Sequence, residues 1–419
     1  MYSSCMLTPI PECSVIIPVF NRWDLTRDCL SSLCEYSVGH DIEVIVVDNG
    51  STDETATDLV SLGRGLFGNR FIPLVFTENR NFGPACNAGA QTATSRFLFF
   101  LNNDTLLTSG WLPPLLYALR DDPSLGAVGP LLLYGDDTVQ HLGAAMGGLG
   151  PMHLYQGFPR THPVVRRKRD LQFITGAALM IAKDLFFDCG AFFDGYRNGF
   201  EDVELCIRIR EQGKKLRCEP DSIVYHLESQ TPGRKCGEEE NSALLTRRCG
   251  KSCYVDLHHH GINDGFSVFI NDMLDISLRL AEQDERDLME QAEKGGVGVW
   301  LRLALENPFW VRGREMLASS LERSGKFDDA MRFRLNLVEI EPLLSRYLDI
   351  MRLLPKYTEE RDWLPTLENH LEIITSFKSD PSRCSAQVGR ILQGKAQGGD
   401  SFLEHIYQEK IRQMFPGSG

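Results

Sequence analysis

Residues 97–104 read FLFFLNND, an apolar run of five residues that leads directly into two asparagines and an aspartate. A continuous apolar run of this length is typical of a strand that is buried on both faces of a sheet. Similar runs occupy residues 14–20, 42–47 and 71–76, and residues 22–33 have a helical pattern. This alternation predicts an α/β domain with a mostly parallel sheet in the first half of the chain.

Polar residues stand where two of these apolar runs end. Asp48 opens the segment DNGS after the second run, and residues 102–104 follow the fourth. Each motif taken alone has an ordinary structural interpretation, since Asx residues make turns and acids such as Glu201 and Asp202 stabilise helix starts. Ligands bind at the carboxyl ends of parallel strands, however, and the order of these motifs in one chain favours a functional site.

The composition limits the classes of partner and the number of domains. A chain of 419 residues with 42% hydrophobic content predicts two or three domains with proper cores. The net charge of −13 argues against nucleic acid as the main partner, because phosphate binding needs a basic surface. No stretch approaches the roughly 20 apolar residues of a membrane span, and the N-terminal residues lack a signal-peptide pattern. We therefore expect a cytoplasmic protein whose membrane contact, if any, is peripheral at the inner face.

The pattern changes after residue 234, where strand-like runs give way to helical, acidic and amphipathic sequence. Residues 309–341 predict a helix pair that turns at Gly325, which resembles one tetratricopeptide-type unit. We expect a catalytic domain at 1–234, a linker at 235–265 and an all-α, tetratricopeptide-like domain at 266–419. At the start of that domain, helical spacing is expected for Phe266, Phe269, Ile270, Met273 and Leu280.

The twelve cysteines are scattered and indicate reduced thiols more than a disulfide framework. Cys236, Cys249 and Cys253 are followed by His258, His259 and His260. Cysteine and histidine together can bind zinc, but this spacing matches no standard zinc finger. Ordinary linker residues are the favoured interpretation, and a zinc site stays open as the alternative.

Seven short segments follow one another in the first part of the chain: SVIIPVFNR (14–22), VVDNGSTD (46–53), NFG (81–83) with Asn87, LNNDT (101–105), TGA (175–177), FEDVEL (200–205) and VYH (224–226). In this order, they resemble the inverting family-2 glycosyltransferases of the GT-A fold. The resemblance covers about residues 13–234.

The resemblance implies a metal site and a nucleotide-sugar donor. Asp104 matches the family's metal-binding aspartate, the last residue of its DxD element, and His226 resembles a second ligand for Mg²⁺ or Mn²⁺. The first DxD position here is Asn102, which lowers the negative charge of the site. A divalent cation fits this chemistry because the donor leaves as a diphosphate, whose growing charge must be neutralised.

The resemblance also assigns the residues that would bind the donor, which we expect to be a UDP- or dTDP-sugar. Asp48 would accept a hydrogen bond from a uracil- or thymine-like imide, and Arg234 would clamp the diphosphate, because arginine pairs with phosphate bidentately. The predicted donor-binding residues are Pro18, Phe20, Asn21, Asp48, Asn81, Gly83, Asn102, Asn103 and Arg234.

Inversion requires one carboxylate that takes the acceptor proton while the acceptor attacks the sugar from the face opposite the leaving group. Asp202 fits this general-base role by resemblance, and Glu201 would orient Asp202 or the donor sugar. Val203, Cys206 and Ile207 share one helical face behind this acid pair, which predicts that the pair stands at a rigid helix start.

The sequence therefore predicts an enzyme that transfers one sugar from a nucleotide-diphosphate sugar to a hydroxyl, or another nucleophile, of a surface-glycan or lipid-linked acceptor. A protein or peptide acceptor docked by the helical region is the alternative, and that region is also available for homo-oligomer formation. A non-catalytic scaffold of the same fold is a rival from another class, disfavoured because Asp48, Asp104, Asp202 and His226 are all present. A nucleotidyltransferase would need a Gly-rich basic loop after the first strand, where this chain has NRWD.

Overall fold

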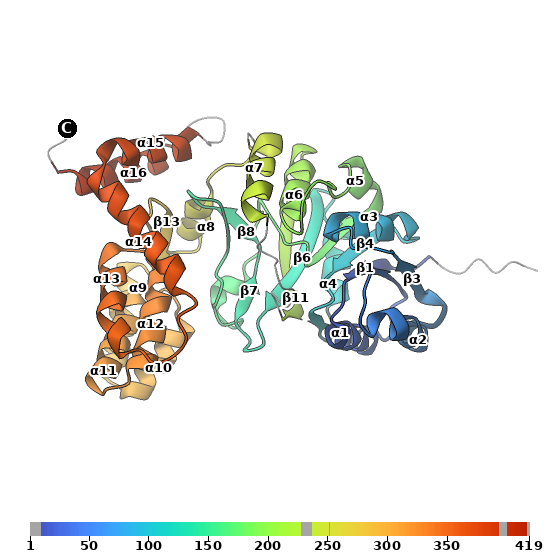
Figure 1. Ribbon diagram of the computed structural model, residues 1–419, viewed down its shortest axis with the longest axis horizontal. Helices are drawn as coiled ribbons and strands as arrows, with labels where there is room; N and C mark the ends of the chain where they lie inside the picture. Colours follow the sequence, from blue (N-terminus) through green and yellow to red (C-terminus); the bar gives the residue numbers. More distant parts are fainter. Residues whose placement is uncertain (1–9, 228–236, 251, 394–399, 417–419) are drawn as a thin grey trace, which may run out of the picture. The chain divides into compact units, whose positions relative to one another are not determined.

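The computed structural model describes residues 10–227, 237–250, 252–393 and 400–416 (Figure 1). The chain divides into two compact units. The first consists of residues 1–144 and 153–252, and the second of residues 145–152 and 253–419. The division after Ser252 falls inside the stretch that was expected to be a linker, and part of that stretch is helical, as α7 (Glu238–Cys249) and α8 (Leu257–Asn263).

A nine-stranded sheet forms the centre of the first unit, with the order β3-β2-β1-β4-β10-β6-β11-β5 and β7 paired to β6. Its first four strands are mutually parallel: β1 (Cys13–Val19), β2 (Ile42–Asp48), β3 (Phe71–Val75) and β4 (Phe97–Leu101). They coincide with the four apolar runs of the sequence. The α/β class predicted for this unit is confirmed.

The other half of the sheet mixes strand directions. β10 (Ala178–Ala182) lies antiparallel between β4 and β6 (Leu125–Leu133), and β11 (Lys215–His226) runs parallel to β6. The short β5 (Thr105–Leu107) and β7 (Val139–His141) are antiparallel to β11 and β6. Thr105 is the register partner of His226, so the residue after Asp104 lies beside the last residue of β11.

Helices connect and cover the strands of this unit. They are α1 (Trp23–Tyr36), α2 (Thr55–Phe67), α3 (Phe82–Thr92), α4 (Leu112–Asp121), α5 (Lys183–Asp188), α6 (Glu201–Glu211) and α7. Helix α3 approaches β1 closely, since a Cβ at Gly89 would stand 2.5 Å from Cγ2 of Ile16. Phe99 of β4 stacks on Trp111 with ring centroids 4.9 Å apart. This buried packing fixes the strand ends that carry the polar motifs.

The second unit is mainly helical, but a β-hairpin follows α8. β12 (Ser267–Ile270) and β13 (Ile276–Arg279) pair antiparallel, so the helix expected around residues 266–280 is wrong. The side chain of Asn271 explains the difference, because its Oδ1 accepts from the backbone N–H groups of Met273 (2.9 Å) and Asp275 (3.0 Å). Asparagine bonds of this kind favour a turn over a continuing helix.

Eight helices follow among the described residues of this unit: α9 (Glu282–Glu293), α10 (Val297–Glu306), α11 (Val311–Arg323), α12 (Phe327–Ile340), α13 (Leu344–Leu353), α14 (Leu364–Ser379), α15 (Pro381–Gln393) and α16 (Ser401–Met414). The predicted helix pair is confirmed as α11 and α12, with Gly325 between them at φ +75°. Leu317 and Ala330 of this pair are buried. Within the described ranges, no helix has both the length and the apolar character needed to cross a bilayer.

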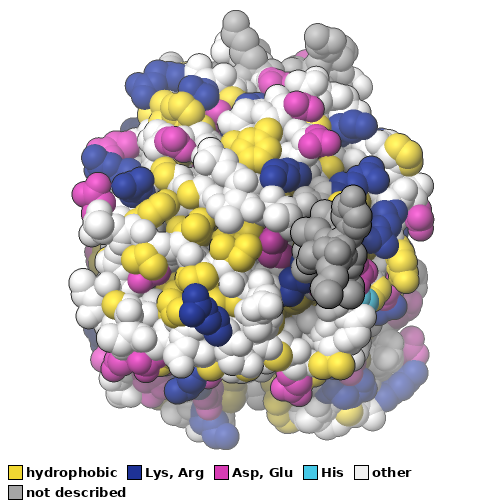
Figure 2. All heavy atoms as spheres, turned by 90° about the vertical axis from the view of Figure 1, so that its right-hand side faces the viewer, with side chains coloured by type: hydrophobic (Ala, Val, Ile, Leu, Met, Phe, Trp, Pro, Cys, Tyr) yellow, Lys and Arg dark blue, Asp and Glu magenta, His cyan; other side chains and the backbone are white. Residues whose placement is uncertain are grey.

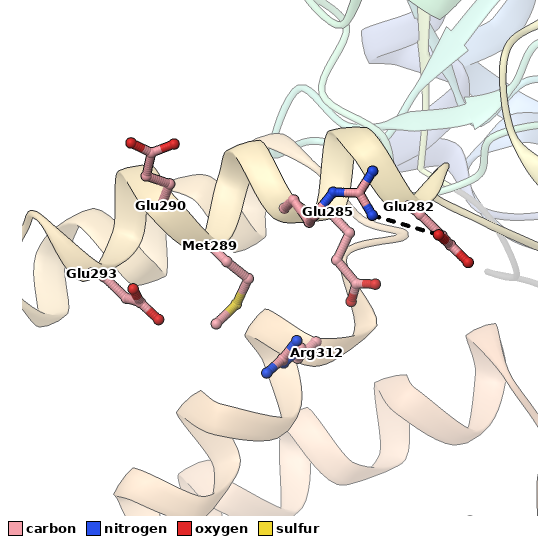
Figure 3. Close-up of a pocket in the computed structure, with 7 residues that line it drawn as sticks. Glu282, Glu285, Met289, Glu290, Glu293 and Arg312 are labelled. Atoms are coloured by element: carbon pink, nitrogen blue, oxygen red, sulfur yellow. Dashed lines mark hydrogen bonds and ion pairs between the residues drawn. The ribbon is translucent and has the colours of Figure 1, made fainter.

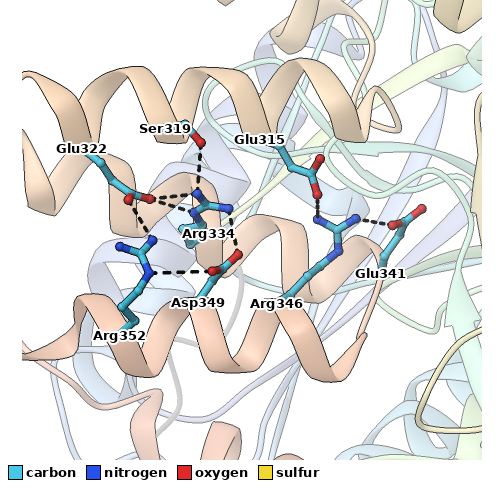
Figure 4. A network of polar contacts seen from close by, with 8 residues as sticks. All are labelled: Glu315, Ser319, Glu322, Arg334, Glu341, Arg346, Asp349 and Arg352. Atoms are coloured by element: carbon cyan, nitrogen blue, oxygen red, sulfur yellow. Dashed lines mark hydrogen bonds and ion pairs between the residues drawn. The ribbon is translucent and has the colours of Figure 1, made fainter.

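Two buried arginines tie α11, α12 and α13 together (Figure 4). Arg334 of α12 donates to Glu322 of α11 at 2.8 and 3.0 Å and to Asp349 of α13 at 3.1 Å. Arg346 of α13 donates to Glu315 of α11 at 2.6 Å and also to Glu341. Each guanidinium therefore bridges carboxylates from neighbouring segments, which fixes the register of these helices.

Candidate active site

The predicted metal ligands meet at the end of the sheet. Oδ1 of Asp104 lies 3.1 Å from Nε2 of His226, and the two side chains are 12% and 5% exposed. The contact follows from the pairing of β5 with β11 and from a bond in which the N–H of Leu227 donates to the Asp104 carbonyl at 2.9 Å. One carboxylate oxygen and one imidazole nitrogen at this separation suit a divalent cation, with phosphate oxygens able to complete its coordination.

The two asparagines before Asp104 point to different places. Nδ2 of Asn102 lies 3.5 Å from Nε2 of His226, so this amide borders the metal-ligand pair. Asn103 instead donates from Nδ2 to the Thr26 hydroxyl of α1 at 2.9 Å. Asn102 is therefore positioned to face the site, whereas the described contact of Asn103 fixes the strand end to α1.

The acid pair opens α6, as the sequence predicted. Glu201 is 6% exposed, and its Oε2 accepts from the N–H of Gly199 at 2.7 Å. Asp202 is half-buried, and its Oδ2 accepts from the N–H of Gly176 at 2.8 Å while Oδ1 accepts from that of Val203. Each carboxylate oxygen has a second lone-pair position, so Asp202 keeps acceptor capacity while it is held in one orientation.

Residues 175–177 connect the acid pair to the metal-ligand pair. Gly176 binds Asp202, and the next carbonyl, that of Ala177, accepts from the N–H of Asn102 at 2.8 Å. A Cβ at Gly176 would stand 3.1 Å from Cβ of Asp202, so glycine permits this close approach. The sequence singled out TGA without a role, and its role in the structure is to join the two parts of the site.

On the donor side, the loops after β1 and β2 hold each other. The N–H of Asn21 donates to the Ser51 hydroxyl at 2.8 Å, and Oδ1 of Asn21 accepts from the N–H of Thr52 at 2.8 Å. Asp48 is 3% exposed, and its Oδ1 accepts from the N–H of Ser51 at 2.8 Å. The predicted residues Asn21 and Asp48 are therefore brought to one pair of loops.

Asn49 extends this contact to the start of α3. Its Nδ2 donates to the Asn81 carbonyl at 3.1 Å, and its Oδ1 accepts from the N–H of Arg80 at 2.8 Å. Asn81 takes a positive φ of 68° just before α3, and the N–H of Phe82 donates to Oδ1 of Asn198, close before α6. Gly83 is buried in the first turn of α3. These bonds form a continuous rim from the β1 and β2 loops to the acid pair.

The remaining predicted donor residues differ in position. Pro18 lies within β1 and Phe20 just after it, with Phe20 38% exposed. A cavity of about 470 Å³ is lined by residues of the same β1 and β2 loops, among them Asn21, Trp23, Thr52 and Asp53. Arg234 lies outside the described residues. Figure 2 shows one face of the molecule on which basic and acidic side chains are interspersed, with neither sign dominating.

Two residues of the site were missed by the sequence analysis. Gln140 of β7 is 3% exposed and contacts the ring and the backbone of His226. His141 accepts from the N–H of Thr175 at 3.1 Å, and burial, with His153 and His226 nearby, holds the pKa of His141 well below its usual value. A neutral imidazole is suited to this acceptor role. Both residues occupy a short strand with no motif, so only the three-dimensional contacts identify them.

In the part of the chain that the structure describes, Cys249 and Cys253 do not converge with the histidines of the zinc site that was left open. Among the described residues, the group that converges is His258, His259 and Asp400, without Cys249 or Cys253, and Cys236 lies outside the described residues. Nε2 of His258 lies 2.6 Å from Oδ2 of Asp400, a hydrogen-bond length. Ligand atoms around a tetrahedral zinc ion stand about 3.3 Å apart, given bonds near 2.0 Å. His258 and Asp400 therefore form a part-buried hydrogen bond.

A second cavity, of about 420 Å³, belongs to the second unit (Figure 3). Four glutamates of α9 line it together with Arg286, Met289 and Arg312, and Glu282 pairs with Arg286 at 3.5 Å. None of the predicted site residues lines this cavity.

The comparison with known proteins finds a family match in the N-terminal unit. The model of the family described as "Glycosyl transferase family 2" matches residues 14–188. The O-antigen biosynthesis protein RfbC of Myxococcus xanthus is 29% identical over 226 residues, 52% of this chain but 17% of that protein. The N-acetylglucosaminyl-diphospho-decaprenol L-rhamnosyltransferase of Mycobacterium tuberculosis is 26% identical over 218 residues, 46% of this chain and 69% of that protein.

Among solved structures, GalNAc-T7 with UDP, GalNAc and Mn²⁺ is 18% identical with a TM-score of 0.43, covering 52% of this chain and 44% of that one. The family match itself spans the strands β1 to β10, whose ends carry the predicted metal and donor motifs. Residues 14–188, within the N-terminal unit, therefore form a domain of the glycosyl transferase family 2 type.

Proposed function

We propose that the chain is an inverting, metal-dependent glycosyltransferase that moves one sugar from a nucleotide-diphosphate sugar to a hydroxyl of a glycan or lipid-linked acceptor. The observation that carries the proposal is the junction through residues 175–177, which links Asp202 to the strand end that holds Asp104 and His226. An in-line displacement at a sugar carbon requires the base and the metal ligands to be held in a fixed position relative to each other, and this junction holds them.

Asp104 and His226 are the residues that would hold the cation. Bound there, Mg²⁺ or Mn²⁺ would neutralise the charge that develops on the departing nucleoside diphosphate. The loops that contain Asn21, Asp48 and Asn81 would bind the nucleotide, as their mutual hydrogen bonds provide a preorganised cradle. Asn102 would contact the donor beside the metal-ligand pair.

Asp202 would take the acceptor proton as the acceptor oxygen attacks the sugar. Two observations favour Asp202 over Glu201 for this role. Asp202 is half-buried, whereas Glu201 is 6% exposed and its Oε2 is engaged by the N–H of Gly199. In addition, the backbone donors of Gly176 and Val203 fix the Asp202 carboxylate and leave lone pairs for the acceptor.

The acceptor class is proposed from the relatives, which include an O-antigen biosynthesis protein and a transferase whose name specifies a decaprenol-linked acceptor. The donor is proposed to be a UDP- or dTDP-sugar, and the site of action to be the cytoplasmic side of the membrane that carries such acceptors.

The test is a screen of the purified full chain against a panel of nucleotide sugars with Mg²⁺ or Mn²⁺, followed by two isosteric variants on the donor that binds. Asp202→Asn should keep donor affinity by calorimetry and lose at least ~10²-fold in transfer rate, since a general base contributes roughly 10²–10⁴-fold. Glu201→Gln should be milder, and Glu211→Gln at the other end of α6 is the control. Transfer by Asp202→Asn at more than about a third of the wild-type rate would refute the assignment of the base.

A further inference from the structure

The side-chain amide of Gln140 contacts His226 at two points. Nε2 of Gln140 donates to the backbone oxygen of His226 at 2.9 Å, and Oε1 of Gln140 lies 2.6 Å from Nδ1 of the same histidine. Gln140 is 3% exposed and His226 is 4% exposed, so both contacts are shielded from water.

These two contacts determine which ring nitrogen carries the proton. A backbone carbonyl only accepts, so the group of Gln140 that faces it must be the NH₂ group. The amide oxygen therefore faces the ring, and because this oxygen also only accepts, Nδ1 of His226 must be the donor. In the neutral imidazole, the lone pair is then on Nε2.

Nε2 is the nitrogen that faces the predicted metal position. It lies 3.1 Å from Oδ1 of Asp104 and 3.5 Å from Nδ2 of Asn102. If the proton moved to Nε2, that nitrogen would donate to the Asp104 carboxylate, and the pair would be satisfied without a cation. The tautomer of His226 therefore decides whether these two side chains form a metal-binding pair or a hydrogen-bonded pair.

We propose that Gln140 is a positioning residue that holds His226 in the Nδ1–H tautomer and so presents Nε2, together with Asp104, to the metal ion. The inference rests on the metal site of the proposed function and adds a residue to it. Histidines that bind metals commonly donate their other N–H to a fixed acceptor, and loss of that acceptor typically weakens metal binding 10- to 100-fold.

The alternative is that Gln140 only satisfies the backbone oxygen of His226. Two variants separate these roles. Gln140→Met has a similar length but neither donor nor acceptor, whereas Gln140→Glu keeps an acceptor for Nδ1 and loses the donor to the carbonyl. Positioning requires that Gln140→Met change the tautomer and that Gln140→Glu preserve it. If Gln140 only satisfied the backbone oxygen of His226, neither variant would change the tautomer.

The first measurement is the tautomer itself, in the full chain labelled with ¹⁵N-histidine and free of metal. Long-range ¹H–¹⁵N correlations distinguish the protonated ring nitrogen, and the His226→Asn spectrum assigns the signal. We expect the proton on Nδ1 in the wild type and in Gln140→Glu, and on Nε2 in Gln140→Met. A wild-type proton on Nε2 would overturn the proposal.

The second measurement is Mn²⁺ binding to the same proteins, followed by the loss of the free-ion electron paramagnetic resonance signal. Gln140→Met should bind Mn²⁺ at least roughly tenfold more weakly, Gln140→Glu within about threefold of the wild type, and the control Gln156→Met like the wild type. Equal binding by Gln140→Met would also overturn the proposal. If Asp104→Asn leaves Mn²⁺ binding unchanged, the metal site is elsewhere; the proposed function then fails together with this inference, even where the tautomer is as expected.

Discussion

Glu204→Gln is expected to destabilise the first unit, although Glu204 was only the last acid of a motif in the sequence. Glu204 is 0% exposed on α6. Arg248 of α7 donates to both of its oxygens at 2.8 Å, and the Tyr196 hydroxyl donates to Oε2 at 2.7 Å. Nε of Arg208 lies 3.4 Å from Oε1. The carboxylate thus joins α6 to α7 and to the segment before α6.

The size of the effect follows from these contacts. A glutamine amide can accept at one position only, so one of the two bonds from Arg248 must be lost, and in the other the Arg248 guanidinium donates to a neutral oxygen instead of a carboxylate. Hydrogen bonds to charged groups are worth about 1.5–3 kcal/mol and neutral ones about 0.5–1.5 kcal/mol. The Arg248 side chain is 37% exposed, so water recovers part of the loss. We expect a loss of about 2–3 kcal/mol at pH 7.

The loss of stability caused by Glu204→Gln should depend on pH. Burial alone would raise the pKa of Glu204, but the hydrogen bonds from Arg248 and Tyr196 and the charge of Arg208 outweigh burial and hold this pKa below its usual value. The stabilisation is therefore present above the unfolded-state value near 4.3 and is lost as the pH falls through the lower folded-state value. The difference between wild type and Glu204→Gln should shrink below about pH 4.

The assay is hydrogen exchange of peptides from α6 and α7, measured by mass spectrometry in increasing urea at pH 7. The same difference between wild type and variant is then measured on samples refolded at pH 4 and at pH 3. Local opening free energies report this unit separately from the helical one. Glu211→Gln, on an exposed turn of the same helix, is the control and should change stability by less than about 0.5 kcal/mol. A loss below about 1 kcal/mol, or one that is the same at all three pH values, would refute the reasoning.

Three further predictions address the site and the helical unit. Asp104→Asn should weaken metal-dependent donor binding at least roughly tenfold by calorimetry without changing the circular dichroism spectrum; unchanged affinity would remove Asp104 from the metal site. Gly176→Ala should lower the transfer rate at near-normal donor affinity, because the new Cβ would stand 3.1 Å from Cβ of Asp202, whereas Gly65→Ala, with open space around it, should not; equal rates would contradict this. Arg334→Met should lower the stability of the helical unit by about 2–4 kcal/mol, because Glu322 and Asp349 lose a buried partner. Hydrogen exchange should then rise in α11 to α13 only. Unchanged exchange there would exclude a stabilising role for the arginine network.

The strands of the first unit could be predicted because a strand that is buried on both faces appears in the sequence as an uninterrupted apolar run. The run at 97–101 is apolar without interruption, since β4 lies between β1 and β10 and is buried on both faces. The positions of Asp104 and Asp202 at a strand end and a helix start were predictable for the same reason. The contact between Asp104 and His226 was expected from resemblance, as no periodicity relates residues so far apart.

The hairpin at 267–279 could not be predicted from apolar spacing alone. Phe266, Phe269, Ile270 and Met273 fit a helical period, but the side chain of Asn271 binds two backbone N–H groups and closes a turn. Gln140 could not be identified from the sequence either, because only its two contacts with His226 on another strand indicate a role. In both cases a single side-chain amide decides the outcome, and such bonds leave no periodic trace in the sequence.

Residues 145–152 belong to the second unit, although the chain on either side of them belongs to the first. Within the second unit, the N–H of Met146 donates to Asp256 at 2.7 Å and that of Gly148 to Asp275 at 2.6 Å. During synthesis, this segment leaves the ribosome more than a hundred residues before its carboxylate partners. Its bonds to Asp256 and Asp275 can therefore form only after the later part of the chain has emerged. The two units therefore cannot be separated by one cut of the chain.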